Sequence, residues 1–419
     1  MKRKIYDELV KWKRESADRY ALLVEGARRV GKSWIVREFA KNEYETHLLI
    51  DFARVNSQIK NLFEEKLDNL DEFFMLLEAR TRVKLVPRKT LIVFDEVQRF
   101  PRAREAVKYL VEDGRFHYIE TGSLISIKKN VENIVIPSEE MKVQMYPMDF
   151  EEFLWALGAD GVMQLIRKRF VDRVPMGQQD HRMVMELFRQ YLVIGGMPQA
   201  VEAFSRGRDL ASAEKAKRVM LDLYQDDIGK FAGRYKQKVR AIWSNIPGAL
   251  SAQEKRFRPA YVGEGVRMRE LDSPFEWLAE SMSVNLASNV TDPNAGLRLT
   301  EDRTAIKCYM ADTGLLVSHS FSENRHATYD MHRNQEDAAS RMEIEFLLAK
   351  SHVTARHNIY PIEVKSANDY TTASMDKFVS KFSNAVAQPI VVHPGDADFS
   401  GAVLRLPLYM AMLIPELTS

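Results

Sequence analysis

The sequence predicts an α/β fold in which a parallel sheet, covered by helices on both faces, is followed by smaller helical and α/β parts. An apolar run at 22–24 leads through a glycine-bounded loop into an amphipathic segment at 33–39. A continuous apolar run at 90–94 ends in two acidic residues, and a third strand-like segment reads FHYIETGSLIS. Strands that alternate with helical segments of this length usually pair in parallel, with helices on both faces of the sheet.

Composition and length are those of a soluble globular protein. The chain has 419 residues, 45% hydrophobic and 29% charged, which is enough for two or three domains with their own cores. Its single cysteine, Cys308, excludes an internal disulfide and every cysteine-based zinc site. No apolar run approaches the roughly 18 to 20 residues of a membrane-spanning helix, and no apolar signal core follows the basic N-terminus. We therefore expect a cytoplasmic protein.

The first elements follow in order along the chain. An amphipathic helix is expected at the N-terminus, where Ile5, Leu9 and Trp12 fall on one face. The strand at 22–24 comes next, followed by a strand at 46–52, the strand at 90–94 and the strand in FHYIETGSLIS. Ligands of such sheets bind at the carboxyl ends of the strands, and the polar motifs of this chain fall there.

The loop after the first strand fits the P-loop (Walker A) pattern GxxxxGK[ST] at every position. Its residues are Gly26, Ala27, Arg28, Arg29, Val30, Gly31, Lys32 and Ser33. Converging backbone N–H groups and the positive end of the following helix suit phosphate groups. Lys32 is expected to reach the β- and γ-phosphates, and the Ser33 hydroxyl to bind Mg²⁺. A chance turn is the alternative, and the complete match in a strand–loop–helix context favours the phosphate site.

Two further strand ends complete this predicted site. Asp95 (Walker B) is expected to hold the metal, usually through a water, and Glu96 to polarise the attacking water. An acidic pair after a strand also occurs as a plain helix start, but the P-loop upstream favours the functional interpretation. Ser123 or Thr121 is a candidate for sensing the γ-phosphate, and an ordinary turn after a strand remains equally compatible with these residues.

Several ordered segments together resemble a family of prokaryotic AAA-type ATPases with a C-terminal region of unknown function. They are GARRVGKS, FDEVQR, TGS, MYPMDFEEFLWALG, YLVIGGMPQAV, ADTGLL, MEIEFLL, YPIEVKS and LPLYMAML. The resemblance covers nearly the whole chain and implies ATP as the nucleotide. It also implies an AAA-like domain at 1–150, a helical segment at 151–225, a winged-helix-like domain at 226–320 and a nuclease-like domain at 321–419.

The residues of the middle region agree with a winged-helix pattern. KVRAIWSNIPGALS and ELDSPFEWLAESMSVNLAS are predicted to be amphipathic helices, and KCYMADTGLL a strand and turn. The segment 230–270 is basic through Lys230, Arg234, Lys236, Lys238, Arg240, Lys255, Arg256, Arg258, Arg267 and Arg269, offset only by Glu254, Glu264 and Glu270. Contact with DNA phosphates is one interpretation of this stripe. A solvated or interdomain face, or a protein-binding module, is the other.

The C-terminal segments EIEFLL and PIEVKS predict a hairpin in which Glu345, Glu363 and Lys365 point to one side. This trio resembles the PD-(D/E)XK nuclease core, where carboxylates hold Mg²⁺. Two features depart from that core: Glu345 replaces the usual Asp, and the polar segment 321–341 lacks the apolar face of the expected helix. Glu336 and Asp337 would replace its acidic residue only by accident. We therefore expect a nuclease-like fold, with part of its core missing, that is not an active nuclease.

Other titratable groups leave alternatives open. His352 and His357 have no metal-site spacing and are predicted to lie on a solvated hairpin tip. An arginine from a neighbouring subunit often completes such a nucleotide site. The candidates, which the sequence does not rank, are Arg28, Arg29, Arg99, Arg102 and Arg104. The oligomeric state is therefore left open.

The functional hypothesis is an ATPase with Glu96 and Lys32 as catalytic residues, whose turnover with Mg²⁺ rearranges the winged-helix-like and nuclease-like domains. The first alternative is a nucleotide-dependent DNA- or protein-binding switch with little turnover. The second is an ATP-regulated nuclease.

Overall fold

The protein is described here by a computed structural model. The ranges that it describes are 1–122, 138–252, 254–293, 297–321, 345–349 and 357–417.

Five parallel strands form the N-terminal sheet. They are β1 (Ala21–Gly26), β2 (Thr46–Asp51), β3 (Thr90–Asp95), β4 (His117–Gly122) and β5 (Glu140–Met145). Their order in the sheet is β2-β3-β4-β1-β5, so that β4 separates β1 from β3. The predicted α/β class with a parallel sheet is confirmed. The sequence analysis missed β5, whose charged and apolar residues alternate as in a half-exposed edge strand.

Helices cover both faces of this sheet, as predicted. On one face lie α1 (Ile5–Glu15) and α2 (Lys32–Glu43), and the predicted face of α1 is buried there. On the other face lie α3 (Ser57–Glu65), α4 (Leu70–Thr81) and α5 (Pro101–Asp113). Alternate residues of the strands enter the two cores, as the period of two along a strand requires.

One ion-pair network is buried against the sheet. Arg104 of α5 is 1% exposed and binds Glu140 of β5 through both Nε and Nη2, at 2.9–3.1 Å. Glu120 of β4 is fully buried, and its carboxylate lies 3.8 Å from the same guanidinium. Burial, together with the nearby Glu140 carboxylate, raises the pKa of Glu120 well above its ordinary value.

A helical region links the sheet to the rest of the chain. It comprises α7 (Phe150–Ala156), α8 (Asp160–Asp172), α9 (Gln178–Ile194), α10 (Pro198–Gly207) and α11 (Leu210–Phe231). The following region contains α12 (Lys236–Ser251), α13 (Asp272–Glu280), β6 (Val284–Val290), β7 (Glu301–Met310) and α14 (Thr313–Ser320). Short 3₁₀ turns lie at Val97–Arg99, Gly233–Tyr235, Pro259–Tyr261, Met268–Glu270 and Leu297–Thr300.

The predicted second amphipathic helix of this middle region is wrong in its last part. The helix α13 ends at Glu280, and Met282 has a left-handed φ of 55°, which a helix does not continue through. The next residues pair with β7 in an antiparallel hairpin as β6. The strand and turn predicted from KCYMADTGLL are β7 and the start of α14.

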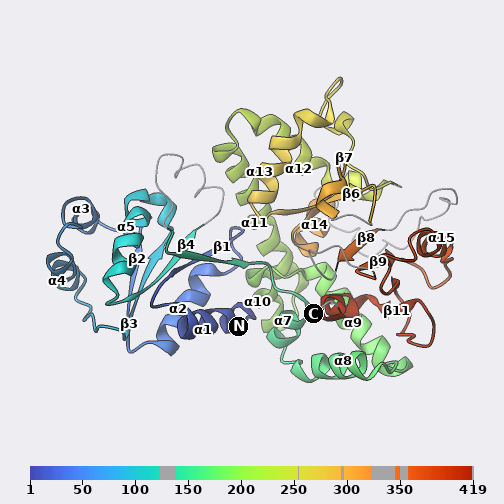
Figure 1. The fold of residues 1–419 in the computed structure, drawn as a ribbon, viewed down its shortest axis with the longest axis horizontal. Helices are drawn as coiled ribbons and strands as arrows, with labels where there is room; N and C mark the ends of the chain where they lie inside the picture. The colour runs from blue at the N-terminus through green and yellow to red at the C-terminus, as the bar shows by residue number, and fades with distance from the viewer. Residues whose placement is uncertain (123–137, 253, 294–296, 322–344, 350–356, 418–419) are drawn as a thin grey trace.

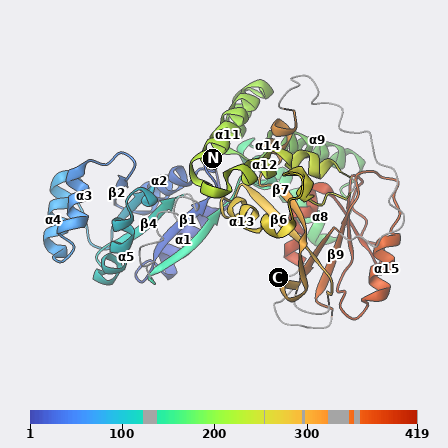
Figure 2. The ribbon, with the colours of Figure 1, turned by 90° about the horizontal axis from the view of Figure 1, so that it is seen from above.

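The C-terminal region forms a second sheet of order β11-β10-β9-β8. Its elements are β8 (Phe346–Ala349), β9 (Ile359–Val364), α15 (Ala373–Lys381), β10 (Ile390–His393), β11 (Leu404–Pro407) and the 3₁₀ segment Leu408–Leu417. The predicted hairpin is confirmed, because β8 and β9 pair antiparallel with Phe346 opposite Ile362. Figures 1 and 2 show this sheet and α15 at the opposite end of the molecule from α3 and α4, with α9 to α14 between them.

Three of the segments that carry the family resemblance meet at one junction. The Met148 N–H donates to the Gly196 carbonyl at 2.7 Å, and the Gly196 N–H donates to Asp312 at 2.6 Å. A Cβ on Gly196 would lie 1.8 Å from the Met148 carbonyl oxygen, so only glycine fits there. Asp312 also caps α14 by accepting from the Leu315 N–H. These segments therefore join the sheet domain to α9 and α14 and have a structural role.

The boundaries of the four domains predicted from the sequence stay predictions, because the helices of the middle region pack against both neighbouring parts. No helix within the described ranges combines the length and the apolar character needed to cross a bilayer.

Replacing the buried carboxyl group of Glu120 should change the thermal stability of the protein by an amount that depends on pH. Because the folded-state pKa of Glu120 is raised above its unfolded value, its contribution to stability is greatest at low pH and is lost as the pH rises through the folded pKa. We expect Glu120→Gln to raise the Tm relative to wild type at pH 8, with a smaller difference at pH 5. Thermal unfolding at both pH values measures this, with the exposed Glu112→Gln on the same domain as the control. A Tm difference that is equal at both pH values would contradict it.

Candidate functional site

The predicted P-loop has the expected strand–loop–helix geometry. Gly31 is the N-cap residue of α2 and has φ of 102°, a left-handed conformation that glycine adopts without strain. The Lys32 side chain lies over the loop, where its ammonium donates to the carbonyl oxygens of Gly26 and Ala27, both at 2.9 Å. A lysine that bonds to its own loop in this way can turn toward a phosphate when one binds.

Burial controls the charge of this lysine. Lys32 is 8% exposed, and desolvation lowers the pKa of its ammonium to about 8, although the carboxylates of Glu96 and Asp95 act in the opposite direction. The anionic groups around Lys32 therefore partly offset the cost of burying its charge.

Asp95 connects the P-loop to two neighbouring strands. The Ser33 hydroxyl donates to Asp95 Oδ1 at 2.7 Å, and the Thr121 hydroxyl at the end of β4 donates to the same oxygen. The Asp95 side chain is 5% exposed, and the Arg37 guanidinium lies 3.5 Å from its other oxygen. The structure thus brings together the three strand ends that the sequence singled out. The oxygen donors of Ser33 and Asp95 fit Mg²⁺, which prefers hard oxygen ligands and keeps several of its waters.

Glu96 lies beside this cluster in an unusual backbone conformation. Its φ is 55°, a left-handed value that is uncommon for a residue other than glycine and frequent at functional sites. Its carboxylate accepts from the Gln98 amide at 2.7 Å, and its backbone N–H lies 3.5 Å from the Thr121 hydroxyl. The sequence analysis did not single out Gln98 or Arg37.

A cleft of about 730 Å³ opens over the P-loop. One wall consists of Lys32, Ser33, Trp34 and Glu96. The other wall comes from α10 and α11, with the residues Pro198, Gln199, Glu202, Asp227, Lys230 and Phe231. This volume lies within the usual range for small-ligand and cofactor sites.

The helix α11 is bonded directly to the P-loop. The Arg28 guanidinium pairs with Asp227 at 2.6 Å, and the Tyr224 hydroxyl donates to the Arg28 carbonyl at 2.9 Å. Neither Tyr224 nor Asp227 was found by sequence reasoning, because about 200 residues separate them from the loop and no local pattern marks them.

The N-terminus also supports the loop. Arg3 is 6% exposed, and its guanidinium donates to the Val30 carbonyl at 2.8 Å and to the Tyr146 carbonyl at 2.7 Å. Its Nε binds Glu152 at 3.1 Å. Glu152 belongs to the capping box of α7, so Arg3 joins the loop to the first helix of the helical region.

The arginine candidates for a neighbouring site differ in access. Arg104 is wrong as a candidate, because its guanidinium is buried against Glu140 and cannot reach another subunit. Arg102 pairs with Glu105 at 3.1 Å, and Arg99 lines the cleft of its own chain. Arg29 is exposed with φ of 70°, and Arg28 pairs with Asp227 as above.

The predicted C-terminal trio also comes together. The Lys365 ammonium pairs with Glu363 at 2.5 Å, and Glu345 accepts from the Val364 N–H at 2.8 Å. Glu363 is 4% exposed, and burial raises the pKa of its carboxyl, while Lys365 acts in the opposite direction. No group of three or more His, Cys, Asp or Glu side chains able to hold a metal lies in the part of the chain that the structure describes.

Part of the positive charge of the basic segment 230–270 is offset by its own acidic residues. Lys238 pairs with Glu270 at 2.9 Å, while Arg256 and Arg258 lie 3.6 and 3.7 Å from Glu254. Ser123, Glu336, Asp337 and His352 lie outside the described residues. His357 lies outside any cluster, with Nδ1 at 2.9 Å from the Val386 carbonyl.

Comparisons with known proteins agree with the geometry of the N-terminal site. Residues 18–154 match a family described as an AAA domain, and residues 185–325 match one described as a domain of unknown function. The N-terminal part is therefore an AAA domain, the kind of P-loop domain that binds nucleotides. No curated protein matches the chain significantly.

Among solved structures, the chain is similar to a Walker-type ATPase of Pyrococcus abyssi with 16% identity and a TM-score of 0.44, over 76% of this chain and 95% of that one. It is similar to Drosophila ORC bound to DNA with 13% identity and a TM-score of 0.29, over 72% and 90% of the two chains. It is similar to PCH-2 of C. elegans with 13% identity and a TM-score of 0.20, over 39% of this chain and 44% of that one.

The Thr121 hydroxyl can be tested without disturbing the loop. Thr121→Val keeps the shape of the side chain but removes one donor from Asp95, a loss of about 1 kcal/mol for a hydrogen bond. We expect nucleotide binding to persist. The Mg²⁺ concentration that gives half of the maximal nucleotide-induced thermal stabilisation should rise roughly fivefold. A Mg²⁺ titration of nucleotide-induced thermal stabilisation measures it. Thr46→Val, at the opposite end of the sheet, is the control, and equal Mg²⁺ midpoints for the two variants would disprove the role.

Proposed function

We propose that this chain binds ATP with Mg²⁺ and hydrolyses it to ADP and phosphate, and that turnover changes the position of α11 relative to the P-loop. The observation that carries the proposal is the hydrogen bond between the Ser33 hydroxyl and Asp95 at 2.7 Å. It places a complete P-loop beside an acidic strand end, as nucleotide hydrolysis requires.

Each residue of the site has a separate role in the proposed hydrolysis. Lys32 leaves the carbonyls of its own loop and bonds to the β- and γ-phosphates at the start of α2. Ser33 and Asp95 would hold Mg²⁺, which would supply positive charge to offset that of the phosphates. Glu96 takes the proton of the attacking water, after its carboxylate releases the Gln98 amide.

The helix α11 provides a route from the nucleotide to the later domains. Its C-terminal half carries Tyr224 and Asp227, which bond to Arg28 in the loop. Its N-terminal half carries Glu214, which accepts from Ser318 of α14 at 2.7 Å. The helix has 22 residues, so it extends about 33 Å as one rigid element. Figure 1 shows it running through the middle of the molecule.

Phosphate groups would compete for the guanidinium that holds α11. Arg28 is part of the P-loop, and its partner Asp227 lines the cleft. A bound triphosphate offers Arg28 more negative charge than one carboxylate does. We therefore infer that ATP weakens the Arg28–Asp227 pair and that loss of the γ-phosphate restores it.

Two alternatives remain from the sequence. A nucleotide-dependent switch would bind ATP with phosphate release at background, which a steady-state phosphate assay separates from an ATPase. A nuclease is favoured only by the closeness of Glu345, Glu363 and Lys365. Incubation of a plasmid with the protein and Mg²⁺ or Mn²⁺ tests it, and an intact plasmid beside active ATP turnover excludes it.

Two substitutions separate binding from turnover. Lys32→Ala should lower ATP affinity by roughly 100-fold, because hydrogen bonds to charged groups contribute about 1.5–3 kcal/mol each. Glu96→Gln should keep ATP affinity and lower turnover by about 10²–10⁴, the usual contribution of a general base. Equilibrium binding and phosphate release measure the two effects. Equal ATP affinity in wild type and Lys32→Ala would refute the assignment.

The link through α11 has a matched control in the next residue. Asp227→Asn frees Arg28 and should reduce the nucleotide-dependent change in amide hydrogen exchange along Leu210–Phe231. Asp226→Asn makes the same change of charge at an exposed side chain that only approaches Lys230 at 4.0 Å, and it should behave as wild type. The same exchange response in both variants would contradict the proposed link.

A further inference from the structure

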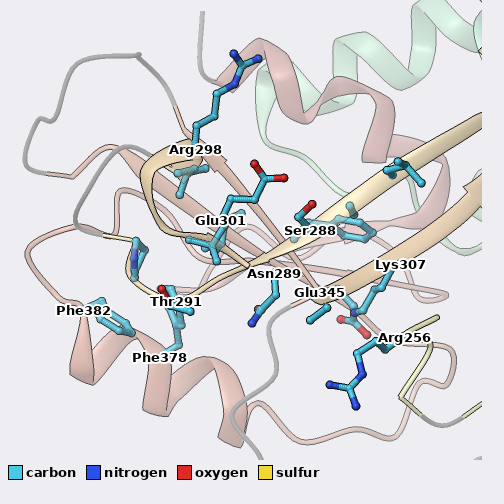
Figure 3. Close-up of a pocket in the computed structure, with 18 of the residues that line it drawn as sticks. Arg256, Ser288, Asn289, Thr291, Arg298, Glu301, Lys307, Glu345, Phe378 and Phe382 are labelled. Carbon is cyan, nitrogen blue, oxygen red and sulfur yellow. The ribbon is translucent and has the colours of Figure 1, made fainter. Parts of the chain in front are cut away.

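A second cleft lies between the β6–β7 hairpin and the C-terminal sheet and shares no lining residue with the cleft over the P-loop. Its volume is about 810 Å³, and we refer to it as the hairpin cleft. The hairpin contributes one wall, including Ser288, Asn289 and Lys307. The start of β8 and the end of α15 contribute the other, including Phe346 and Phe382. Figure 3 shows these elements facing each other.

Several basic side chains line this cleft. Arg298, Lys307 and Lys381 are lining residues, and none of them forms an ion pair with another residue in the described ranges. Arg298 and Lys381 are exposed, and Lys307 is half-buried. The three come from the hairpin and from α15, so they surround the cleft from both walls.

The acidic residues of the lining are already engaged. Glu254 lies within 3.7 Å of both Arg256 and Arg258, and Glu301 lies 3.9 Å from Arg303. Glu345 accepts from the backbone N–H of Val364. The N–H bond leaves the charge of Glu345 in place, so over the whole lining the four basic side chains exceed the three acidic ones by a single charge.

Aromatic side chains lie beside these cations. The rings of Phe378 and Phe382 are 4.9 Å apart, and the Lys381 ammonium lies 5.1 Å above the Phe382 ring. Phe346 is 37% exposed and rests against Tyr309 with 6.1 Å between ring centroids. Figure 3 places Phe378 and Phe382 together at one end of the cleft and Lys307 and Glu345 toward the other.

Cations interleaved with aromatic rings are the chemistry that binds single-stranded nucleic acid. Cations contact the phosphates, and the bases stack on the rings without regard to sequence. The cleft volume falls in the range that encloses a few small groups, whereas a duplex is about 20 Å across and needs a broad surface.

The neighbouring helix does not suit a duplex either. On α13, Asp272 and Glu276 are exposed, so this face would repel the phosphates of a DNA groove. The basic segment 230–270 is partly neutralised by its own ion pairs, as described above.

We propose that the hairpin cleft binds a single strand of nucleic acid, with its phosphates at Arg298, Lys307 and Lys381 and a base stacked on Phe382. The inference is independent of ATP hydrolysis.

The test uses the full chain and fluorescein-labelled dT20, rU20 and a dT20–dA20 duplex, with fluorescence anisotropy over a range of salt concentrations. Wild type should bind the single strands more tightly than the duplex. The triple variant Arg298→Ala, Lys307→Ala, Lys381→Ala should lose at least tenfold in affinity, and its salt slope should fall by about 2, since each phosphate contact of a single strand contributes about 0.7. The proposal is supported whether dT20 or rU20 is the single strand that binds more tightly.

Two controls keep the test decisive. The first control is a triple variant that removes three exposed charges from the N-terminal domain: Lys11→Ala, Lys41→Ala, Lys108→Ala. It should bind the single strands with the affinity of wild type. Phe382→Leu should weaken binding without changing the salt slope, a split that general loss of folding would not produce. Equal affinity in the two triple variants overturns the proposal. Tighter binding of the duplex than of the single strands by wild type also overturns the proposal. The same holds if wild type shows a normal thermal unfolding transition but does not bind the single strands.

Discussion

The hydrogen bond between the Ser33 hydroxyl and the Asp95 carboxylate is the interaction on which the nucleotide site depends. Its two ends lie 62 residues apart, with Ser33 at the start of α2 and Asp95 at the end of β3, and β4 lies between β1 and β3 in the sheet. The inserted strand brings the Thr121 hydroxyl to the same carboxylate oxygen. Asp95 is thereby held by polar groups from both sides, which keeps a buried anion in place before any cation arrives.

The sequence predicted the parts of the site that are encoded locally. Lys32, Ser33 and Asp95 follow from short patterns at strand ends, and the parallel sheet follows from alternating strands and helices. Contacts that need the folded chain were missed: Arg3 and Asp227 carry no motif, and no sequence signal shows that they reach the P-loop. The strand β5 was missed for another reason, since half-exposed edge strands contain charged residues.

The junction around Gly196 explains why some sequence segments resemble a family without bearing chemistry. A glycine is required where the backbone of Met148 approaches, and a buried Asp312 is required to accept the Gly196 N–H. Burial raises the pKa of the Asp312 carboxyl, while the N–H groups of Gly196 and Leu315 lower it. The result is a buried polar joint that connects the N-terminal sheet to α9 and α14.

The attachment of Arg3 has a practical consequence for work with this protein. The side chain of Arg3 supports the end of the phosphate loop, and Met1 itself lines the cleft above it. A substitution at Arg3 would therefore reach the loop without changing any residue of the Walker motifs, and a loss of nucleotide affinity in such a variant would be no evidence that Arg3 contacts phosphate.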